Sequence, residues 1–190
     1  MITLPITYSY GGLGNDTLQG ADWADLTQYG SATDPIRQIE RASIRTFVEK
    51  HKHLLTGRVL DFGAGKPGTC RQPQPYRDLV AGEYVPIDEG DGMPHGMFDA
   101  VLFTQVIQYL PHASLNIQAF DSLKQGGWLV MTYPTAWSDG DCDLFRFTRT
   151  GMAVLLERAG FHVSEHVVRA RVMVGSFEFS LGYGVIARKT

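Results

Sequence analysis

The chain has 190 residues, 44% of them hydrophobic and 19% charged, which is typical of a single globular domain that buries a sizeable core. The formal net charge of −3 argues against a general nucleic-acid binder, because such a protein needs a basic surface to release counterions. The two cysteines, Cys70 and Cys142, form no CxxC pair, so neither a disulfide framework nor a metal site is expected. The opening residues lack the pattern of a signal peptide, and no apolar run approaches the ~20 residues of a membrane span, so we expect a cytoplasmic protein without a membrane partner.

The first half of the chain predicts an irregular start followed by a helix and two strands. Asp34 and Pro35 are typical of a helix start, with Asp as the N-cap and Pro at the first helical position. Three prolines between Gly65 and Tyr76 disfavour a long helix directly after the glycine-rich segment. In chain order, the predicted elements are an irregular arm or cap over 1–33, an amphipathic helix over 35–51, a strand over 58–61, a short helix over 75–80 and a strand over 83–87.

The second half alternates apolar strands with helices and ends in two strands. The segment 98–103 is almost continuously apolar, as expected for a parallel strand that is buried on both faces. Gly126 and Gly127 are interpreted as a helix stop, and Thr148 as a helix N-cap. The predicted elements are a strand over 98–103, short helices over 104–109 and 114–125, a strand over 128–133, a helix after Thr148, and strands over 161–174 and 178–188. The late basic residues are interpreted as a solvated strand edge: Arg169, Arg171, Arg188 and Lys189.

This order predicts one α/β domain with a layered, Rossmann-like architecture. Alternating strands and helices indicate a mostly parallel sheet with right-handed crossovers, covered by helices on both faces as a three-layer sandwich. The last two strands have a short connection, so they are expected to pair as an antiparallel C-terminal hairpin. The core domain is placed at 34–190.

The segment around the first strand carries the chemistry. Gly63, Gly65 and Gly68 satisfy the spacing GxGxxG, in which glycines let a ligand approach the backbone closely. Asp61 precedes them, and its carboxylate would repel a pyrophosphate but attract a ligand with an ammonium and a sulfonium. Asp88, at the end of the next strand, can accept hydrogen bonds from both hydroxyls of a ribose. The glycines and Asp88 fit a nicotinamide dinucleotide or an adenosyl ligand, and Asp61 favours the second.

At this point the chain resembles the class I S-adenosylmethionine-dependent methyltransferase family, in its small single-domain subgroup. The resemblance depends on ordered motifs between residues 59 and 161 rather than on any one of them. These are VLDFGAG at 59–65, PYRDLV at 75–80, YVPID at 84–88, FDAVLFTQVIQYLP at 98–111, LKQGGWLVMTYP at 123–134 and LFRFTRTGMAVLLERAGF at 144–161.

The resemblance implies cofactor-binding roles by position. The methionine part of S-adenosylmethionine would lie against Asp61, Gly63, Ala64 and Gly65, and the ribose against Asp88. The adenine would be flanked by Asp91, Gly92 and Met93, although Asp91 is equally well explained as surface charge. The methyl-bearing side would be lined by Phe103, Thr104 and Gln105, with a core position as the alternative for Phe103.

Two departures from the family pattern stand out. Only nine residues separate Asp88 from Phe98, where the family usually has a helix and a third strand, so the third-strand edge is expected to be reduced to a loop. Gln108 and Tyr109 stand where members often carry Glu-His after the fourth strand. An activity that relied on that histidine would be lost or changed.

Methyl transfer to a hydroxyl or amine can require a general base. The candidates are His112, Tyr133 and Asp139, with His95 behind them. Each has a structural alternative, because His112 could cap a helix, Tyr133 could be core and Asp139 lies in a turn.

The loop after the fifth strand is expected to face the acceptor. Trp137 and Arg146 are the predicted substrate-binding residues, and Arg146 could bind an acidic group or tie the loop to Asp141 or Asp143. The N-terminal arm over 1–33, which contains several aromatic residues, is expected either to close over the site or to pack on the sheet or on a second subunit of a homodimer. The expected function is methyl transfer to a small molecule. The alternatives are a nicotinamide-dependent oxidoreductase and a methyltransferase-fold partner module without turnover.

Overall fold

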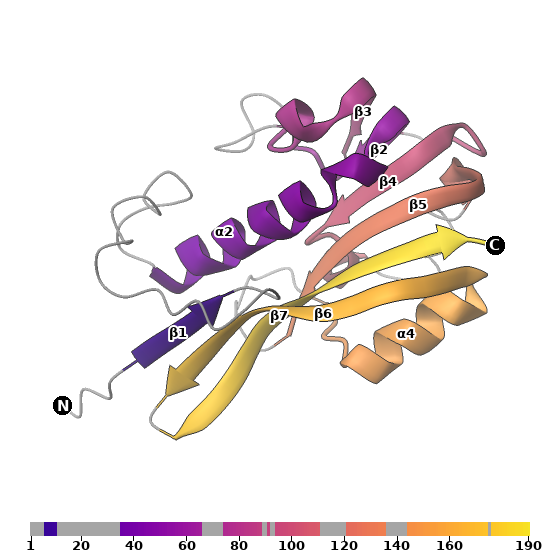
Figure 1. Cartoon of the computed structure of the whole chain (residues 1–190). Coiled ribbons are helices and arrows are strands. Elements are labelled where there is room, and N and C mark those ends of the chain that lie inside the picture. The colour runs from indigo at the N-terminus through magenta and orange to yellow at the C-terminus, as the bar shows by residue number, and fades with distance from the viewer. Residues whose placement is uncertain are drawn as a thin grey trace.

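A seven-stranded sheet forms the centre of the molecule in the computed structural model (Figure 1), which describes residues 6–10, 35–65, 74–88, 91, 94–110, 121–135, 144–174 and 176–190. The strand order is β1-β6-β7-β5-β4-β2-β3. The strands are β1 (Ile6–Tyr10), β2 (Thr56–Phe62), β3 (Ala81–Ile87), β4 (Phe98–Thr104), β5 (Leu123–Pro134), β6 (Phe161–Val174) and β7 (Phe177–Lys189).

The strand directions confirm the predicted mostly parallel sheet with an antiparallel C-terminal hairpin. Neighbours β3, β2, β4 and β5 run parallel, whereas β7 is antiparallel to both β5 and β6. In the described part of the chain no strand lies beyond β3, so that edge is reduced as the short spacing before Phe98 predicts. The carboxyl ends of β3, β2, β4 and β5 therefore meet at one edge of the sheet.

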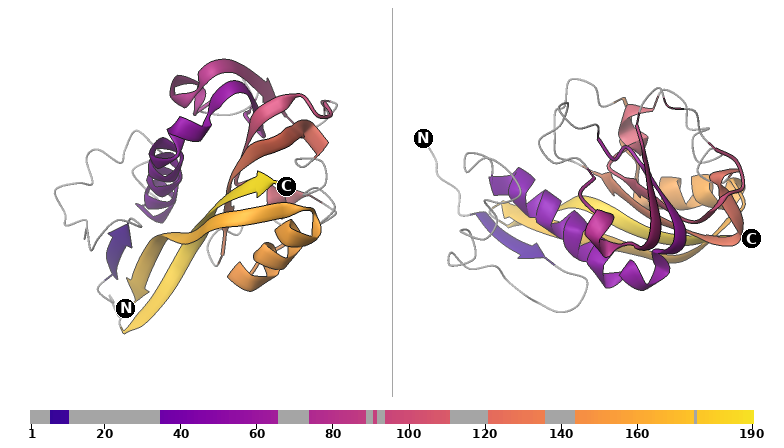
Figure 2. Two further views of the ribbon diagram at one scale, coloured as in Figure 1. Left: turned by 45° about the vertical axis from the view of Figure 1, so that its right-hand side comes forward. Right: turned by 90° about the horizontal axis from the view of Figure 1, so that it is seen from above.

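Helices cover both faces of the sheet, as expected for a three-layer arrangement (Figure 2). Helix α2 (Pro35–Lys50) packs through Phe47 and Val48 on the face that includes Val59 of β2. Helix α4 (Arg149–Arg158) packs through Met152 and Leu156 on the opposite face. Among the residues that the structure describes, the short 3₁₀ turns are η2 (Lys52–Leu54), η3 (Arg77–Leu79) and η4 (Ile107–Tyr109).

Several local predictions hold closely. The helix predicted at 35–51 ends at Lys50, and Thr148 caps α4 because its hydroxyl accepts a hydrogen bond of 3.0 Å from the amide of Gly151. The short helices predicted at 75–80 and 104–109 are the 3₁₀ turns η3 and η4. Among the described residues, no helix has the length and apolar character needed to cross a membrane.

Two predictions differ from the structure, both for reasons of long-range pairing. Residues 6–10, predicted as irregular, form β1 because the edge of β6 offers unpaired backbone groups that any extended segment can join. Strand β5 begins at Leu123 rather than at 128, because Leu123 pairs with Phe98 of β4. Gly126 and Gly127 therefore lie within a strand at a register shift and are not a helix stop. Residues 114–120 of the helix predicted at 114–125 lie outside the described residues, and its last three residues belong to β5 instead.

A close contact joins α2 to the sheet at Gly184 of β7. A Cβ atom at Gly184 would lie 2.5 Å from the ring of Phe47, which is itself buried. We expect Gly184→Ala to lower the free energy of unfolding by about 1–3 kcal/mol, because the tightly packed ring must move. Urea unfolding measures this, with Gly151→Ala in the first turn of α4 as the control. Equal stability of the two variants would contradict the contact.

Candidate functional site

The glycine-rich turn lies at the carboxyl end of β2, between β3 and β4 in the sheet. Gly63 and Gly65 have φ angles of 80° and 73°, a left-handed region that favours glycine. The amides of Gly63 and Ala64 both donate to the carbonyl of Ile87, at 2.9 and 3.2 Å. These bonds fasten the turn to the end of β3, so the segment that carries Asp61 and the one that carries Asp88 lie on adjacent strand ends.

Asp61 is buried at the base of this turn, with only 1% of its surface exposed. The hydroxyl of Tyr84 donates to its Oδ2 at 2.5 Å. Burial raises the pKa of Asp61 to about 7, and the hydrogen bond from Tyr84 opposes that rise. A cation placed beside this carboxyl would stabilise its charged form.

Two tyrosines that the sequence analysis did not single out support this carboxyl. Tyr84 stands opposite Val59 in the parallel register, two residues before the pair Asp61 and Pro86, so its side chain is on the same face as Asp61. Tyr76 is buried nearby and is hydrogen-bonded to Thr104, and its burial raises its pKa to about 12. The alternation of residues along β3 could have indicated Tyr84, whereas no local pattern indicates Tyr76.

Asp88 follows β3 and is half-buried, at the strand end next to the turn. Its amide donates to Oδ2 of Asp91 at 2.9 Å, and the amide of Asp91 donates back to its carbonyl at 3.0 Å. Asp91 therefore stabilises the backbone of Asp88 through these two hydrogen bonds, and it is otherwise exposed to solvent. Gly92 and Met93, the other predicted adenine contacts, lie outside the described residues.

The end of β4 contributes Thr104 and Gln105 to the same edge. Gln105 has a φ of 55°, unusual for a residue other than glycine, and its amide donates to the carbonyl of Thr132 at 2.9 Å. Phe103 is buried and its ring is stacked on that of Phe62, with the two centroids 5.3 Å apart. The structure thus places Phe103 in the core, which was the alternative for this residue.

The predicted general bases are only partly within the described structure. His112 and Asp139 lie outside it, as does Trp137, and His95 is exposed. Tyr133 is fully buried, and its hydroxyl is 2.7 Å from Nε2 of His166. Burial lowers the pKa of His166 to about 4 and raises that of Tyr133, so both groups are neutral at pH 7 and share this hydrogen bond. This arrangement does not favour Tyr133 as a proton acceptor for a substrate.

Two arginines occupy different environments from each other. Arg146, a predicted substrate residue, is exposed and donates to the carbonyl of Phe145 at 3.2 Å. Arg169, interpreted from the sequence as part of a solvated strand edge, is instead 4% exposed. That interpretation is wrong for Arg169, because helix α2 covers it and supplies its hydrogen-bond partners.

Comparisons with known proteins identify the fold. No family model matches the chain, and no curated protein matches it either. Solved structures do: an S-adenosylmethionine-dependent methyltransferase from Archaeoglobus fulgidus is 13% identical with a TM-score of 0.57, covering 79% of this chain and 94% of its own. The chain has the class I methyltransferase fold. In this fold the candidate site lies at the carboxyl ends of parallel strands, where open α/β sheets bind their ligands.

Two further methyltransferase structures extend the similarity. One from Mesorhizobium loti is 15% identical with a TM-score of 0.52, covering 78% of this chain and 97% of its own. The 1,6-didemethyltoxoflavin-N1-methyltransferase of Burkholderia thailandensis, solved with 1,6-didemethyltoxoflavin and S-adenosylhomocysteine, is 18% identical with a TM-score of 0.56 and covers 94% of this chain and 93% of its own. At such low sequence identity, these similarities show a shared methyltransferase fold and nothing about the substrate.

Proposed function

We propose that this protein binds S-adenosylmethionine at the turn after β2 and transfers its methyl group to a small-molecule acceptor. The observation that carries the proposal is the buried carboxyl of Asp61 directly before the turn, with Asp88 at the adjacent strand end. The first suits a cationic methionine part, and the second suits a ribose. The methyltransferase fold supports the same assignment.

The electrostatics of the turn favour this cofactor over a dinucleotide. A pyrophosphate would repel the ionised form of Asp61 and would be tolerated only with this carboxyl protonated. An ammonium and a sulfonium reverse that effect, because opposite charges stabilise each other in a site of low dielectric. The nicotinamide-dependent oxidoreductase is therefore the weaker alternative.

The residues of the chain would act mainly by positioning. When bound, the cofactor would supply an electrophilic methyl group on a sulfonium. Asp61 would orient the ammonium, Asp88 the ribose hydroxyls, and the strained backbone at Gln105 would border the methyl-bearing side. Such orientation can supply much of the rate enhancement of an in-line displacement. His112 and Asp139, which lie outside the described residues, stay our candidates for removing an acceptor proton.

A small-molecule acceptor agrees with the Burkholderia neighbour, which was solved with 1,6-didemethyltoxoflavin. It also agrees with the net charge of −3, which gives no general attraction to nucleic acid. Trp137 and Arg146 stay predicted contacts for the acceptor. A cytoplasmic location and a homodimer stay part of the proposal.

Calorimetric titration of S-adenosylmethionine tests the cofactor site. We expect Asp61→Ala and Asp88→Ala each to weaken binding by tenfold or more, because each removes a charged hydrogen-bonding group worth about 1.5–3 kcal/mol. Glu178→Ala, which removes an exposed carboxylate on β7, is the control and should bind like the parent chain.

The same experiment separates the alternatives. Unchanged affinity in both aspartate variants would refute the proposed site, and tight binding of NAD without any response to S-adenosylmethionine would favour the oxidoreductase. Binding without formation of S-adenosylhomocysteine over a broad acceptor panel would favour a partner module.

A further inference from the structure

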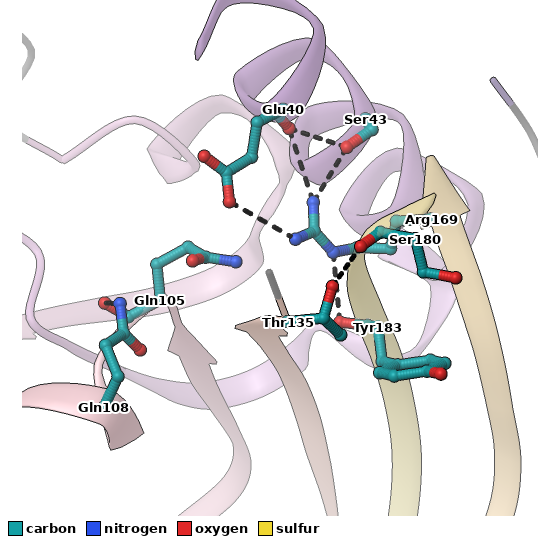
Figure 3. A network of polar contacts seen from close by, with 8 residues as sticks. All are labelled: Glu40, Ser43, Gln105, Gln108, Thr135, Arg169, Ser180 and Tyr183. Atoms are coloured by element: carbon teal, nitrogen blue, oxygen red, sulfur yellow. Dashed lines mark hydrogen bonds and ion pairs between the residues drawn. The ribbon is translucent and has the colours of Figure 1, made fainter. Parts of the chain in front are cut away.

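A buried guanidinium links helix α2 to the sheet next to the candidate site (Figure 3). The side chain of Arg169 has no exposed surface, and it crosses from β6 over β7. Its Nε donates to the carbonyl of Tyr183 at 3.0 Å, and its Nη1 donates to Ser43 Oγ at 2.8 Å and to the carbonyl of Glu40 at 3.3 Å. Its Nη2 has no hydrogen-bond acceptor in the described structure and lies 3.9 Å from Oε1 of Glu40.

The chain leaves space for this group at Gly182 of β7. A Cβ atom at Gly182 would overlap Nη2 of Arg169 and would also lie only 2.7 Å from the carbonyl oxygen of Tyr133. The guanidinium is therefore held over the end of β5, because Gly182 is paired with Pro134 there. Nη2 of this fully buried cation therefore has Glu40 as its ion-pair partner but no hydrogen-bond acceptor in the described structure.

Two glutamines on the other side of β5 also have uncommitted buried atoms. Nε2 of Gln108 donates to the carbonyl of Gln105 at 2.9 Å, which fixes the orientation of that amide. Oε1 of Gln108 is consequently an acceptor, and it has no partner in the described structure. The amide nitrogen of Gln105 is likewise buried without a partner, and Figure 3 shows this side chain extending toward Arg169 and Glu40.

These groups flank the end of β5 from both neighbouring strands. The backbone of Gln105 is bonded to Thr132 on the β4 side, and Arg169 lies over Gly182 on the β7 side. Two strand spacings, roughly 10 Å, separate β4 from β7, and the side chain of Gln105 extends toward Arg169 across this distance. Buried polar atoms without partners are costly, so a ligand that satisfies them gains affinity at this position.

We propose that this end of β5 is the acceptor subsite and that it takes an uncharged group with a carbonyl oxygen beside an N–H, such as an amide or a lactam. The carbonyl oxygen accepts from Arg169 Nη2 or Gln105 Nε2, and the N–H donates to Gln108 Oε1. The group is uncharged because Glu40 already balances the charge of Arg169, so a buried ion added there would lack a counter-charge. This inference depends on the proposed methyl transfer, since it names the acceptor of that reaction.

Three probes of equal size test the inference on the complex with S-adenosylhomocysteine: benzamide, benzoate and benzylamine. Ligand-observed NMR titration should find benzamide to be the tightest of the three. Gln108→Met should weaken benzamide binding about tenfold, because it removes the fixed acceptor, and Gln105→Met should weaken it less. Gln125→Met, which replaces an exposed glutamine near the start of β5, is the matched control and should leave binding unchanged.

The outcomes are distinct. Tighter binding of benzoate or benzylamine would overturn the uncharged amide, and unchanged benzamide binding in both variants would overturn the subsite. Absence of binding by all three probes to a chain that binds S-adenosylhomocysteine would overturn the inference while leaving the proposed function intact. A chain that binds no S-adenosylhomocysteine would overturn both.

Discussion

Affinity for S-adenosylmethionine is expected to fall about fivefold between pH 7 and pH 6 and about tenfold for each further unit, because Asp61 must be ionised to hold the cofactor's ammonium. Burial holds the pKa of this carboxyl at about 7 in the free protein. Below that pH the carboxyl is protonated, and binding must first release the proton. A single carboxyl with this pKa raises the apparent dissociation constant by a factor of about 2 at pH 7 and about 11 at pH 6, relative to a pH at which it is fully ionised.

The sign of this effect distinguishes Asp61 from an ordinary surface aspartate. A carboxyl with a pKa near its usual value of 3.8 is ionised throughout the pH range from 5.5 to 7.5 and would give a flat profile. The α-amino group of the cofactor has a pKa of about 8 and stays mainly protonated over the same range. A decrease in affinity toward acid therefore reports the protein.

Calorimetry between pH 5.5 and 7.5, in two buffers with different ionisation enthalpies, measures both the affinity and the protons released. Close to one proton should be released per cofactor at pH 6. Asp61→Asn is the matched control, with weak and pH-independent binding. A flat affinity profile without proton release in the parent chain would show that Asp61 does not contact the cation.

The parts of the fold that the sequence predicts are those determined by local patterns. The continuous apolar run at 98–103 and the proline and cap residues around 34 and 148 each define an element without knowledge of its neighbours. The turn at 61–65 and the C-terminal hairpin of β6 and β7 are likewise predicted by local sequence patterns. Their order along the chain then restricts the topology, because parallel connections in a sheet are right-handed.

What could not be predicted depends on contacts between distant residues. Arg169 and Ser43 are separated by 126 positions, and no pattern near Arg169 distinguishes it from the exposed Arg171 two residues later. Strand β1 pairs with β6 through backbone groups, which carry no sequence signal. The start of β5 at Leu123 similarly depends on its partner Phe98.

The candidate site likewise has one part that the sequence predicts and another that depends on tertiary contacts. Asp61, Asp88 and the glycines are recognisable because they follow strands, whereas the burial that raises the pKa of Asp61 is a tertiary effect. Gln108 stood out in the sequence only as a departure from the family pattern. Its fixed amide and uncommitted oxygen give that departure a physical meaning, as a polar group that replaces a titratable one.

Replacing Arg169 should have the largest effect on stability. We expect Arg169→Met to lower the free energy of unfolding by about 3–5 kcal/mol, because it leaves a buried network without its cation. The carbonyl of Tyr183 and the hydroxyl of Ser43 each lose a donor, and the carboxylate of Glu40 loses its counter-charge. Burial lowers the pKa of Arg169 only to about 10, so the group is charged at neutral pH and its loss is a loss of charge.

Arg171→Met is the matched control, since the same substitution on the same strand removes an arginine whose side chain is 47% exposed. It should change the free energy of unfolding by no more than about 0.5 kcal/mol. Urea unfolding of both variants measures the difference, and equal stabilities would contradict a structural role for the buried guanidinium. The double variant Glu40→Gln with Arg169→Met should recover part of the loss, because the uncompensated carboxylate is then removed as well. Arg169 would thus hold α2 against the hairpin with Nε and Nη1, while Nη2 lies beside Glu40 and over Gly182, which links the stability of the domain to the polarity of its proposed acceptor subsite.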